Sequence, residues 1–341
     1  MIKLKENEMT IGERIKQMRR ANGHSLRALA QSVGVSAMAI SKYERDKDIP
    51  SSGVLLRLSD TLKAPLDFFL RPARINIQLL AYRKHASLKI KEQEAIQAQI
   101  QNWIERYMEL ESFFDDAASS PLPCYEVSNM EDIEKAAQRL RKDWAIGFDP
   151  IENVMELFED RGIKVGLIMG FEDFDACIFR ANETPVIVVR ENTPGDRQRF
   201  NLCHELGHLV LRIEGDLDEE KAAHRFASAF LAPAESVRHE LGTYRSNIDL
   251  MELESLKHKY GLSMQAWIYR AKDLGIISNP VAEKYFRLFR KNFWYRNEPG
   301  ELYPPEKPQR MQRLIYRALA EDIISRSKMK EYQGDFLNQP I

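Results

Sequence analysis

The sequence predicts an α+β fold that is mainly α, with a small β-sheet near the middle of the chain. Apolar residues recur at helical spacing over most of the 341 residues, which indicates amphipathic helices. Segments 162–169, 175–180 and 185–190 are instead short and apolar, and the last is almost entirely β-branched, which indicates three strands. The length suffices for two or three domains of ordinary size.

The composition is typical of a globular protein, with 44% hydrophobic and 30% charged residues. No apolar run has the roughly 18 residues that indicate a transmembrane helix, and the N-terminus lacks the apolar core of a signal peptide. Cys124, Cys177 and Cys203 are too few and too scattered for a disulfide framework or a cysteine-rich zinc module. We therefore expect a cytoplasmic protein with no membrane partner.

Charge is unevenly distributed along a chain whose net charge is only −1. Residues 1–72 contain 13 Lys and Arg against 8 Asp and Glu, whereas the remaining residues contain 37 against 43. The basic surplus favours an anionic partner for the N-terminal end alone.

Residues 10–70 have the pattern of five short helices. Thr10 and Ser25 stand at positions typical of helix N-caps, and Gly23 ends the first helix. The turn at 34–36 separates the second helix from the third, and Pro65 opens the last one.

Residues 88–114 predict one long helix, because apolar residues recur there at alternating spacings of four and three. This seam consists of Ile96, Ile100, Trp103, Tyr107, Leu110 and Phe114. Two interpretations stay open. The seam packs on this chain's own domains, or it pairs with a second copy in a homodimer.

Most of the chain after a linker at 117–123 is expected to be helical outside the three strands. Pro194 begins a helix that carries the stretch NLCHELGHLVLR, and an acidic loop precedes another helix at 219–231. Four prolines within 297–308 predict an exposed connection. Residues 253–277 repeat the helix–Gly–Ser–helix order found earlier in the chain.

His204, Glu205 and His208 form an HExxH pattern inside the helix that follows Pro194. Residues four apart share one helical face, so the two histidines can direct ring nitrogens to one ion. Glu205 projects near the same face and can act as general base toward water. Cys203 points about 100° away and is expected to be a small buried residue. The pattern predicts a catalytic Zn²⁺ site, against the alternative of two helix histidines without a metal.

A catalytic zinc ion takes three protein ligands and keeps one position open. The helix after the acidic loop offers Asp218, Glu219, Glu220 and His224 as the third. Glu220 lies on the inward side, three residues before Ala223 of the apolar face, and is our first choice. His224, one turn further on, is its rival, either as a ligand or as a neighbour that hydrogen-bonds to one.

These two helices resemble those of the ImmA/IrrE family of bacterial zinc metallopeptidases, over roughly residues 130–280. The family's pattern is an HExxH helix and then a Glu-x-x-Ala helix that ends in Leu-x-Pro. The matching positions are His204, Glu205, His208, Glu220, Ala223, Phe226, Ala227, Leu231 and Pro233. The resemblance implies a zincin-like domain in which Zn²⁺ binds His204, His208 and Glu220, and Glu205 is the catalytic base. His224 departs from the family's usual Asn or Asp.

Residues 10–70, above all SLRALAQSVGVSAMAISKYERDKDIPS, resemble an XRE-type (Cro/C1-type) helix-turn-helix domain. In that fold the third helix enters the major groove of double-stranded DNA. The resemblance implies DNA contacts from Arg27, Ser36, Ala37, Met38, Ser41, Lys42 and Arg45. Leu26 stands where many relatives carry a glutamine that reads bases, which limits the expected hydrogen-bond readout.

The expected organisation therefore has four parts. They are an XRE-type head at 8–72, a long linker helix at 73–118, a zinc peptidase domain at 119–245, and a helical C-terminal region with a helix-turn-helix-like segment at 246–341.

The expected function is a DNA-binding transcriptional regulator that carries a zinc-dependent endopeptidase. Relatives of the peptidase cleave a helix-turn-helix repressor encoded nearby, often in stress or phage circuits. The resemblance thus implies a repressor or a toxin as the protein partner. The alternative is a non-catalytic repressor or antitoxin that uses the peptidase fold to sense or bind a partner.

Overall fold

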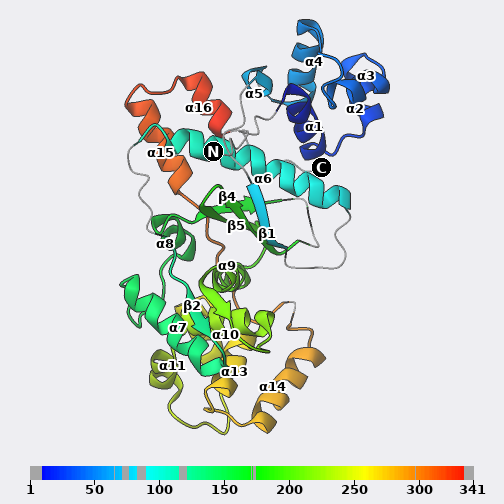
Figure 1. Ribbon diagram of the computed structural model, residues 1–341. Helices are drawn as coiled ribbons and strands as arrows, with labels where there is room; N and C mark the ends of the chain where they lie inside the picture. The colour runs from blue at the N-terminus through cyan, green and yellow to red at the C-terminus, as the bar shows by residue number, and fades with distance from the viewer. Residues whose placement is uncertain are drawn as a thin grey trace.

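The computed structural model describes residues 10–333, except 65, 71–76, 83–89, 115–120, 170, 172, 173 and 296. Within these residues 16 helices and 6 strands form a helical head, a sheet layer and a helical body (Figure 1). The predicted α+β class with an N-terminal helical head is confirmed. The expected domain ends at 8, 72 and 118, and much of the expected linker at 117–123, lie outside the described residues.

The head contains the five predicted helices. They are α1 (Ile11–Ala21), α2 (Leu26–Val33), α3 (Ala37–Tyr43), α4 (Ser52–Leu62) and α5 (Leu66–Leu70). At the start of α1, the Thr10 hydroxyl accepts from the Glu13 N–H, while the Glu13 carboxylate accepts from the Thr10 N–H. Gly34 has φ 71° and ends α2 in the left-handed conformation. The apolar faces of the helices meet in one small core.

The sheet layer has four strands in the order β1-β4-β5-β3. They are β1 (Ile77–Tyr82), β3 (Lys164–Ile168), β4 (Ala176–Ala181) and β5 (Thr184–Arg190). The last three are the predicted strands; β4 and β5 form an antiparallel hairpin, and β3 runs parallel to β5. β1 corrects the expectation of a linker helix from residue 73. It forms because its backbone pairs antiparallel with β4, far away in the sequence.

The long helix α6 (Ile90–Glu111) confirms the predicted helix, and its apolar seam faces the sheet. Ile100 and Tyr107 are 0% exposed and belong to one core cluster with Phe179 of β4. Trp103 lies against Gly166 of β3, where an added Cβ would come within 3.1 Å of the indole ring. The seam therefore packs on this chain's own sheet. A homodimer stays a prediction and would need another surface.

Helices cover both faces of the sheet. α6 and α15 (Arg310–Ala320) share the core cluster of one face, to which α16 (Arg326–Gln333) adds Tyr332. On the other face, Val165, Ile187 and Val189 share a cluster with α9 (Gly195–Val210). The helix that carries the HExxH pattern thus packs against the buried sheet, which lies above α9 in Figure 1.

The helical body surrounds α9 with a large apolar core. Its other helices are α7 (Met130–Asp143), α8 (Val154–Asp160), α10 (Glu219–Leu231), α11 (Ala234–Leu241), α12 (Leu250–Tyr260), α13 (Met264–Asp273) and α14 (Asn279–Lys291). A small parallel sheet, not predicted, joins β2 (Tyr125–Val127) to β6 (Leu211–Ile213), directly after α9. Among the described residues, no helix combines the length and apolar character needed to cross a membrane.

The segment 297–308 is a mostly exposed connection without helix or strand, as its prolines predict, but Glu306 within it is buried. The buried carboxylate of Glu306 accepts hydrogen bonds from the N–H groups of Val154 and Met155 at the start of α8. It also pairs with Arg199 of α9, whose side chain is 0% exposed. Unpaired N–H groups at a helix start attract carboxylates, and this attraction holds the segment against the body.

The head rests on the outer side of α6. Arg14 of α1 is 1% exposed and forms an ion pair with Glu105 of α6. Arg20 pairs with Glu94 at 2.8 Å, beside a hydrogen bond from the Gln99 side chain to the carbonyl of Ala21. The head therefore contacts the body through α1, and α2 and α3 lie away from α6 (Figure 1).

Candidate metal centre and nucleic-acid interface

The C-terminal half of α9 presents the HExxH residues. His204 is 0% exposed and Glu205 is 1% exposed, whereas His208 lies in the last turn with a side chain that is 19% exposed. The strand β6 follows immediately, so the chain leaves the helix beside His208. One face of α9 thus carries two imidazoles that lead from the interior toward solvent.

A close crossing of α9 and α10 positions the third candidate ligand. A Cβ added to Gly207 would lie 3.2 Å from Cα and 3.4 Å from Cβ of Ala223. Two small residues therefore meet where the helices cross, and the axes approach closely. Glu220, one turn before Ala223, is carried next to both histidines by this approach. Asp218 is instead occupied as N-cap of α10, where it accepts from the Lys221 N–H at 2.9 Å.

The polar atoms of His204, His208 and Glu220 lie close together. The two Nε2 atoms are 3.2 Å apart, Oε2 of Glu220 lies 3.4 Å from His204 Nε2, and Oε1 of Glu220 lies 3.5 Å from His208 Nε2. Zn²⁺ bonds of about 2.0–2.1 Å at tetrahedral angles separate neighbouring ligand atoms by about 3.3 Å. The donor set and its spacing therefore fit a zinc ion with one open position.

His224 lies beside the same atoms. Its ring centroid is 4.5 Å from that of His204, and it stacks on Phe200 at 5.6 Å with an interplanar angle of 26°. Ligand atoms of His204, Glu220 and His224 also lie within 4.8 Å of one another. The structure thus brings His204, His208, Glu220 and His224 together. His224 is placed to act either as a ligand or as a neighbour that hydrogen-bonds to one.

The cysteines near the cluster are neutral thiols. Burial raises the pKa of Cys177 on β4 well above its usual value, and the carboxylate of Glu205 adds to the increase. Burial also raises the pKa of Cys203, which is 0% exposed, as expected for a small buried residue. Neither side chain offers a thiolate to an ion at neutral pH.

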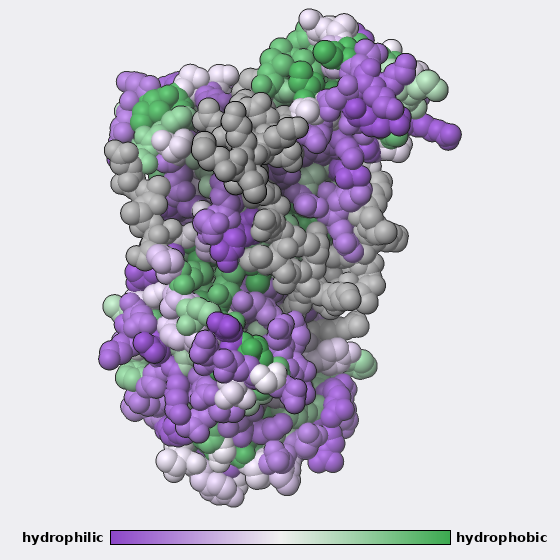
Figure 2. Space-filling view, in the orientation of Figure 1, coloured by the Kyte–Doolittle hydropathy of each residue, from purple (hydrophilic) through white to green (hydrophobic). Residues whose placement is uncertain are grey.

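The head presents the predicted DNA-contacting residues on an open surface. Met38 is 70% exposed, and Arg27, Lys42 and Arg45 are also exposed. The surface over α2 and α3 is largely hydrophilic (Figure 2). Ala37 and Ser41 are partly exposed.

Two of these side chains have structural tasks in α3. The hydroxyl of Ser36 accepts from the Ala39 N–H at 3.1 Å and caps the helix. Arg45 donates to the carbonyl and hydroxyl oxygens of Ser41 at 3.0 and 2.6 Å. Among the described residues, Lys42 and Arg27 are exposed and form no such hydrogen bond.

Comparison with family models gives two matches. A helix-turn-helix model matches residues 15–69, and the peptidase M78 model, described as an IrrE N-terminal-like domain, matches residues 158–272. The chain thus contains a helix-turn-helix domain and, after it, a domain of the ImmA/IrrE peptidase type. No curated protein matches it. The M78 match runs from the end of α8 to α13 and includes all four candidate metal-site residues.

The peptidase domain has a pocket of about 290 Å³ next to the histidines. It lies between α9, α10 and β6 and is lined by His208, Glu219, Ala223 and all three residues of β6. The pocket therefore borders His208, the more exposed of the two histidines.

Sequence reasoning missed the part that Gly207 plays in this domain. Gly207 occupies one of the two positions that the HExxH pattern leaves unspecified. A signal existed, because Gly207 lies three residues after His204 and Ala223 lies three after Glu220. Small residues at equal offsets from the ligands of two helices indicate a close crossing.

Proposed function

We propose that this regulator is a zinc-dependent endopeptidase tethered to double-stranded DNA in the cytoplasm. The observation that carries the proposal is the close approach of His204, His208 and Glu220, in which each histidine Nε2 lies 3.4–3.5 Å from one Glu220 carboxylate oxygen and 3.2 Å from the other Nε2. The helix-turn-helix match supplies the DNA-binding half. The substrate class we propose is a regulatory protein, such as a repressor or toxin encoded by a neighbouring gene.

Each residue of the site has a proposed task. His204, His208 and Glu220 hold the ion, and their spacing leaves a fourth position open. When bound, Zn²⁺ supplies Lewis acidity that polarises a peptide carbonyl and favours loss of a proton from water. Glu205, beside the ligands, takes that proton and delivers it to the leaving amine.

On the DNA side, we propose that Lys42, Arg27 and Arg45 contact phosphates or base edges, and that Ser36, Ala37, Met38 and Ser41 face the groove. Met38, highly exposed and apolar, suits contact with thymine methyl groups. We also propose that the chain is divided into the four parts expected from the sequence, and that residues 73–118 contribute β1 and α6 to the sheet layer.

The deciding experiment uses the full chain and two matched variants. The wild type should contain one zinc ion per chain by elemental analysis and should cut the neighbouring regulatory protein. Glu205→Gln should keep its zinc and lose about 10²–10⁴-fold in cleavage rate, because it cannot take the proton. His208→Ala should lose zinc. A Glu205→Gln chain that cuts at the wild-type rate would contradict the proposal.

His224 favours a second candidate function. If it joins His204, His208 and Glu220, the ion has four protein ligands, which is typical of structural rather than catalytic zinc. The chain would then be a repressor or antitoxin whose body senses or binds a partner. In that case His224→Ala should weaken zinc binding as strongly as His208→Ala, and Glu205→Gln should leave promoter regulation in cells unchanged.

A further inference from the structure

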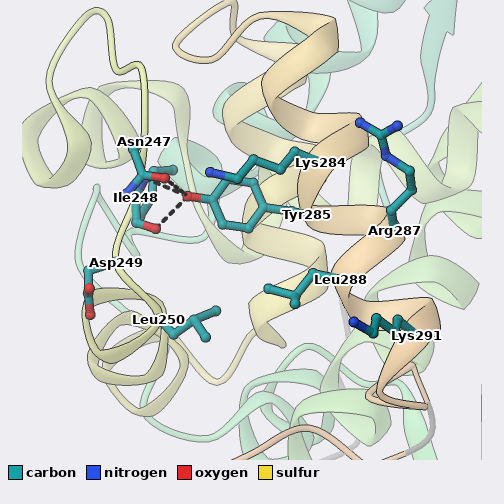
Figure 3. Close-up of a pocket in the computed structure, with 9 residues that line it drawn as sticks. All are labelled: Asn247, Ile248, Asp249, Leu250, Lys284, Tyr285, Arg287, Leu288 and Lys291. Carbon is teal, nitrogen blue, oxygen red and sulfur yellow. Dashed lines mark hydrogen bonds between the residues drawn. The ribbon is translucent and has the colours of Figure 1, made fainter.

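A second pocket lies far along the chain from the metal cluster, between the segment before α12 and the helix α14. Its volume is about 380 Å³, which is enough for one or two side chains of a bound peptide. Figure 3 shows Leu250 and Leu288 on opposite walls and Tyr285 between the two elements.

The floor of this pocket is apolar. The side chain of Tyr285 is buried, and its hydroxyl accepts from the Ile248 N–H at 2.7 Å. The same hydroxyl lies 2.5 Å from the Ile248 carbonyl oxygen and 2.9 Å from Oδ1 of Asn247. The hydroxyl thus uses its hydrogen bonds on Asn247 and Ile248. A ligand would therefore contact the aromatic ring of Tyr285. Leu250 and Leu288 extend this apolar surface.

The rim of the pocket on α14 is cationic. Lys284, Arg287 and Lys291 all line it and are exposed. In the part of the chain that the structure describes, none of the three forms an ion pair with a carboxylate; the pair on this helix is Arg290–Glu283, at 3.9 Å. Like charges one turn apart on a helix repel each other. Because no carboxylate of the described residues pairs with these three cations, an anionic ligand would relieve their repulsion.

The single acidic residue of the pocket does not supply that counter-charge. Asp249 is the N-cap of α12, and its carboxylate accepts from the Met251 N–H at 2.8 Å. Figure 3 shows its side chain directed away from the three cations.

We propose that this pocket docks an acidic peptide segment of the protein partner, with an apolar side chain inserted between Leu250 and Leu288. Carboxylates of the peptide would pair with Lys284, Arg287 and Lys291, and the apolar residue would cover the ring of Tyr285. The proposed docking concerns binding alone. It therefore holds whether the site of His204, His208 and Glu220 cuts the partner or only senses it.

Charge and shape together favour a peptide over nucleic acid. A DNA backbone would satisfy the three cations but would leave the apolar floor uncovered, because its phosphates and sugars have no side chain to insert. An acidic peptide satisfies both features at once.

The test measures binding of a fluorescein-labelled, Glu-rich peptide with a central Leu-Phe pair to the full chain, by fluorescence anisotropy at low and physiological salt. The double variant Lys284→Glu/Lys291→Glu should weaken binding by about tenfold or more, because it reverses two rim charges. Leu288→Ala should weaken it less and without changing its salt dependence. The control Lys135→Glu/Arg290→Glu has the same net charge and should bind like wild type.

Matched peptides and a competitor decide between the outcomes. Replacing Glu by Gln, or Leu-Phe by Ser-Ser, should each weaken binding. Circular dichroism and thermal melting should show that the variants remain folded. The proposal is overturned if the wild type does not bind the peptide, if the control variant loses as much affinity as the pocket variant, or if random duplex DNA binds in the peptide's place and depends on the same lysines.

Discussion

The α2–α3 unit of the head and the α12–α13 unit of the body share one local design. Each has a left-handed glycine after the first helix, Gly34 with φ 71° and Gly261 with φ 61°. Each then has one apolar residue and a serine that caps the second helix. The hydroxyls of Ser36 and Ser263 accept from the N–H three residues later at 3.1 and 3.2 Å. At the level of backbone and caps, the two units are the same.

Their surroundings differ. Met38 is 70% exposed, whereas the matched Gln265 is only partly exposed, and Arg270 is 0% exposed, whereas the matched Tyr43 is partly exposed. The carboxylate of Glu298 also accepts from the Met264 and Gln265 N–H groups at the N-terminus of α13. A helix N-terminus attracts phosphates, and here Glu298 already occupies it.

The comparison teaches that helix-turn-helix grammar specifies a turn between two helices, and that packing decides whether the second helix reads DNA. In the head, that helix is left open. In the body, it is a structural part of the peptidase domain's core. Substitutions at matched positions should therefore affect DNA binding in one unit and stability in the other.

The largest expected effect is on stability, from Arg270→Ala in the buried unit. Arg270 donates to both carboxylate oxygens of Glu134 and to the carbonyl of Ala232 at 2.9 Å. Removing one partner of a buried ion pair costs about 3–5 kcal/mol. Denaturant unfolding should show this loss, whereas Lys272→Ala, on the same helix but partly exposed, should change stability by less than about 0.5 kcal/mol.

The same variant should have a characteristic pH dependence. Burial alone would raise the pKa of Glu134, but the guanidinium groups of Arg270 and Arg225 more than offset it and hold the pKa below its ordinary value of 4.5. A carboxyl whose folded pKa is depressed contributes stability above its unfolded pKa and loses it as the pH falls through the folded pKa. The difference between wild type and Arg270→Ala should therefore narrow in acid. A constant difference at all pH values would argue against the ion pair as its cause.

The turn glycines should respond unequally to alanine, although their φ angles are alike. An added Cβ at Gly261 would lie 2.3 Å from Nε of Arg199. The Arg199 side chain is buried and forms an ion pair with Glu306. Gly34 has nothing within 4 Å of such an atom. Gly34→Ala should therefore cost only the left-handed strain of about 1–2 kcal/mol. Gly261→Ala should add an overpacking cost of about 1–3 kcal/mol. Equal losses of free energy of unfolding would show that Arg199 moves aside freely.

These contrasts mark what the sequence could predict. Local signals were sufficient for the five head helices, for the strands β3–β5 and for the meeting of His204, His208 and Glu220, because each depends on neighbouring residues and helical periodicity. The spacing of the α6 seam showed which face is buried but not what covers it. A sheet and a partner helix accept the same apolar stripe.

What the sequence did not reveal depends on contacts between distant segments. β1 forms by pairing with β4, and its own sequence pattern does not predict a strand. Glu306 caps α8 from 152 residues away, so its proline-rich surroundings suggested only an exposed turn. Likewise, the burial of α13 follows from the core around it and not from its turn.

DNA affinity should distinguish the units at matched positions. Lys42→Ala should weaken binding of the full chain to random duplex DNA by about tenfold near 0.1 M salt and lower the salt slope by about one, because one phosphate contact is lost. Tyr269→Ala, at the corresponding position of α13, should leave DNA affinity unchanged. Fluorescence anisotropy over a salt series measures both. Tyr269 is 45% exposed, so the two side chains differ in charge and not in accessibility. Equal losses of DNA affinity would contradict the assignment of DNA binding to the head.

The smallest expected effect is the loss of the caps, and here the two units should behave alike in stability. Ser36→Ala and Ser263→Ala each remove one side-chain acceptor from a helix start, which costs about 1 kcal/mol. Their consequences should then diverge. At Ser263, the carboxylate of Glu298 still accepts from the next two N–H groups and keeps the helix start in place. At Ser36, no acidic residue substitutes among the described hydrogen bonds, so α3 should fray at its N-terminus, the end that we propose contacts DNA. Hydrogen exchange of the α3 and α13 amides measures this difference, and faster exchange confined to α3 is the expected result.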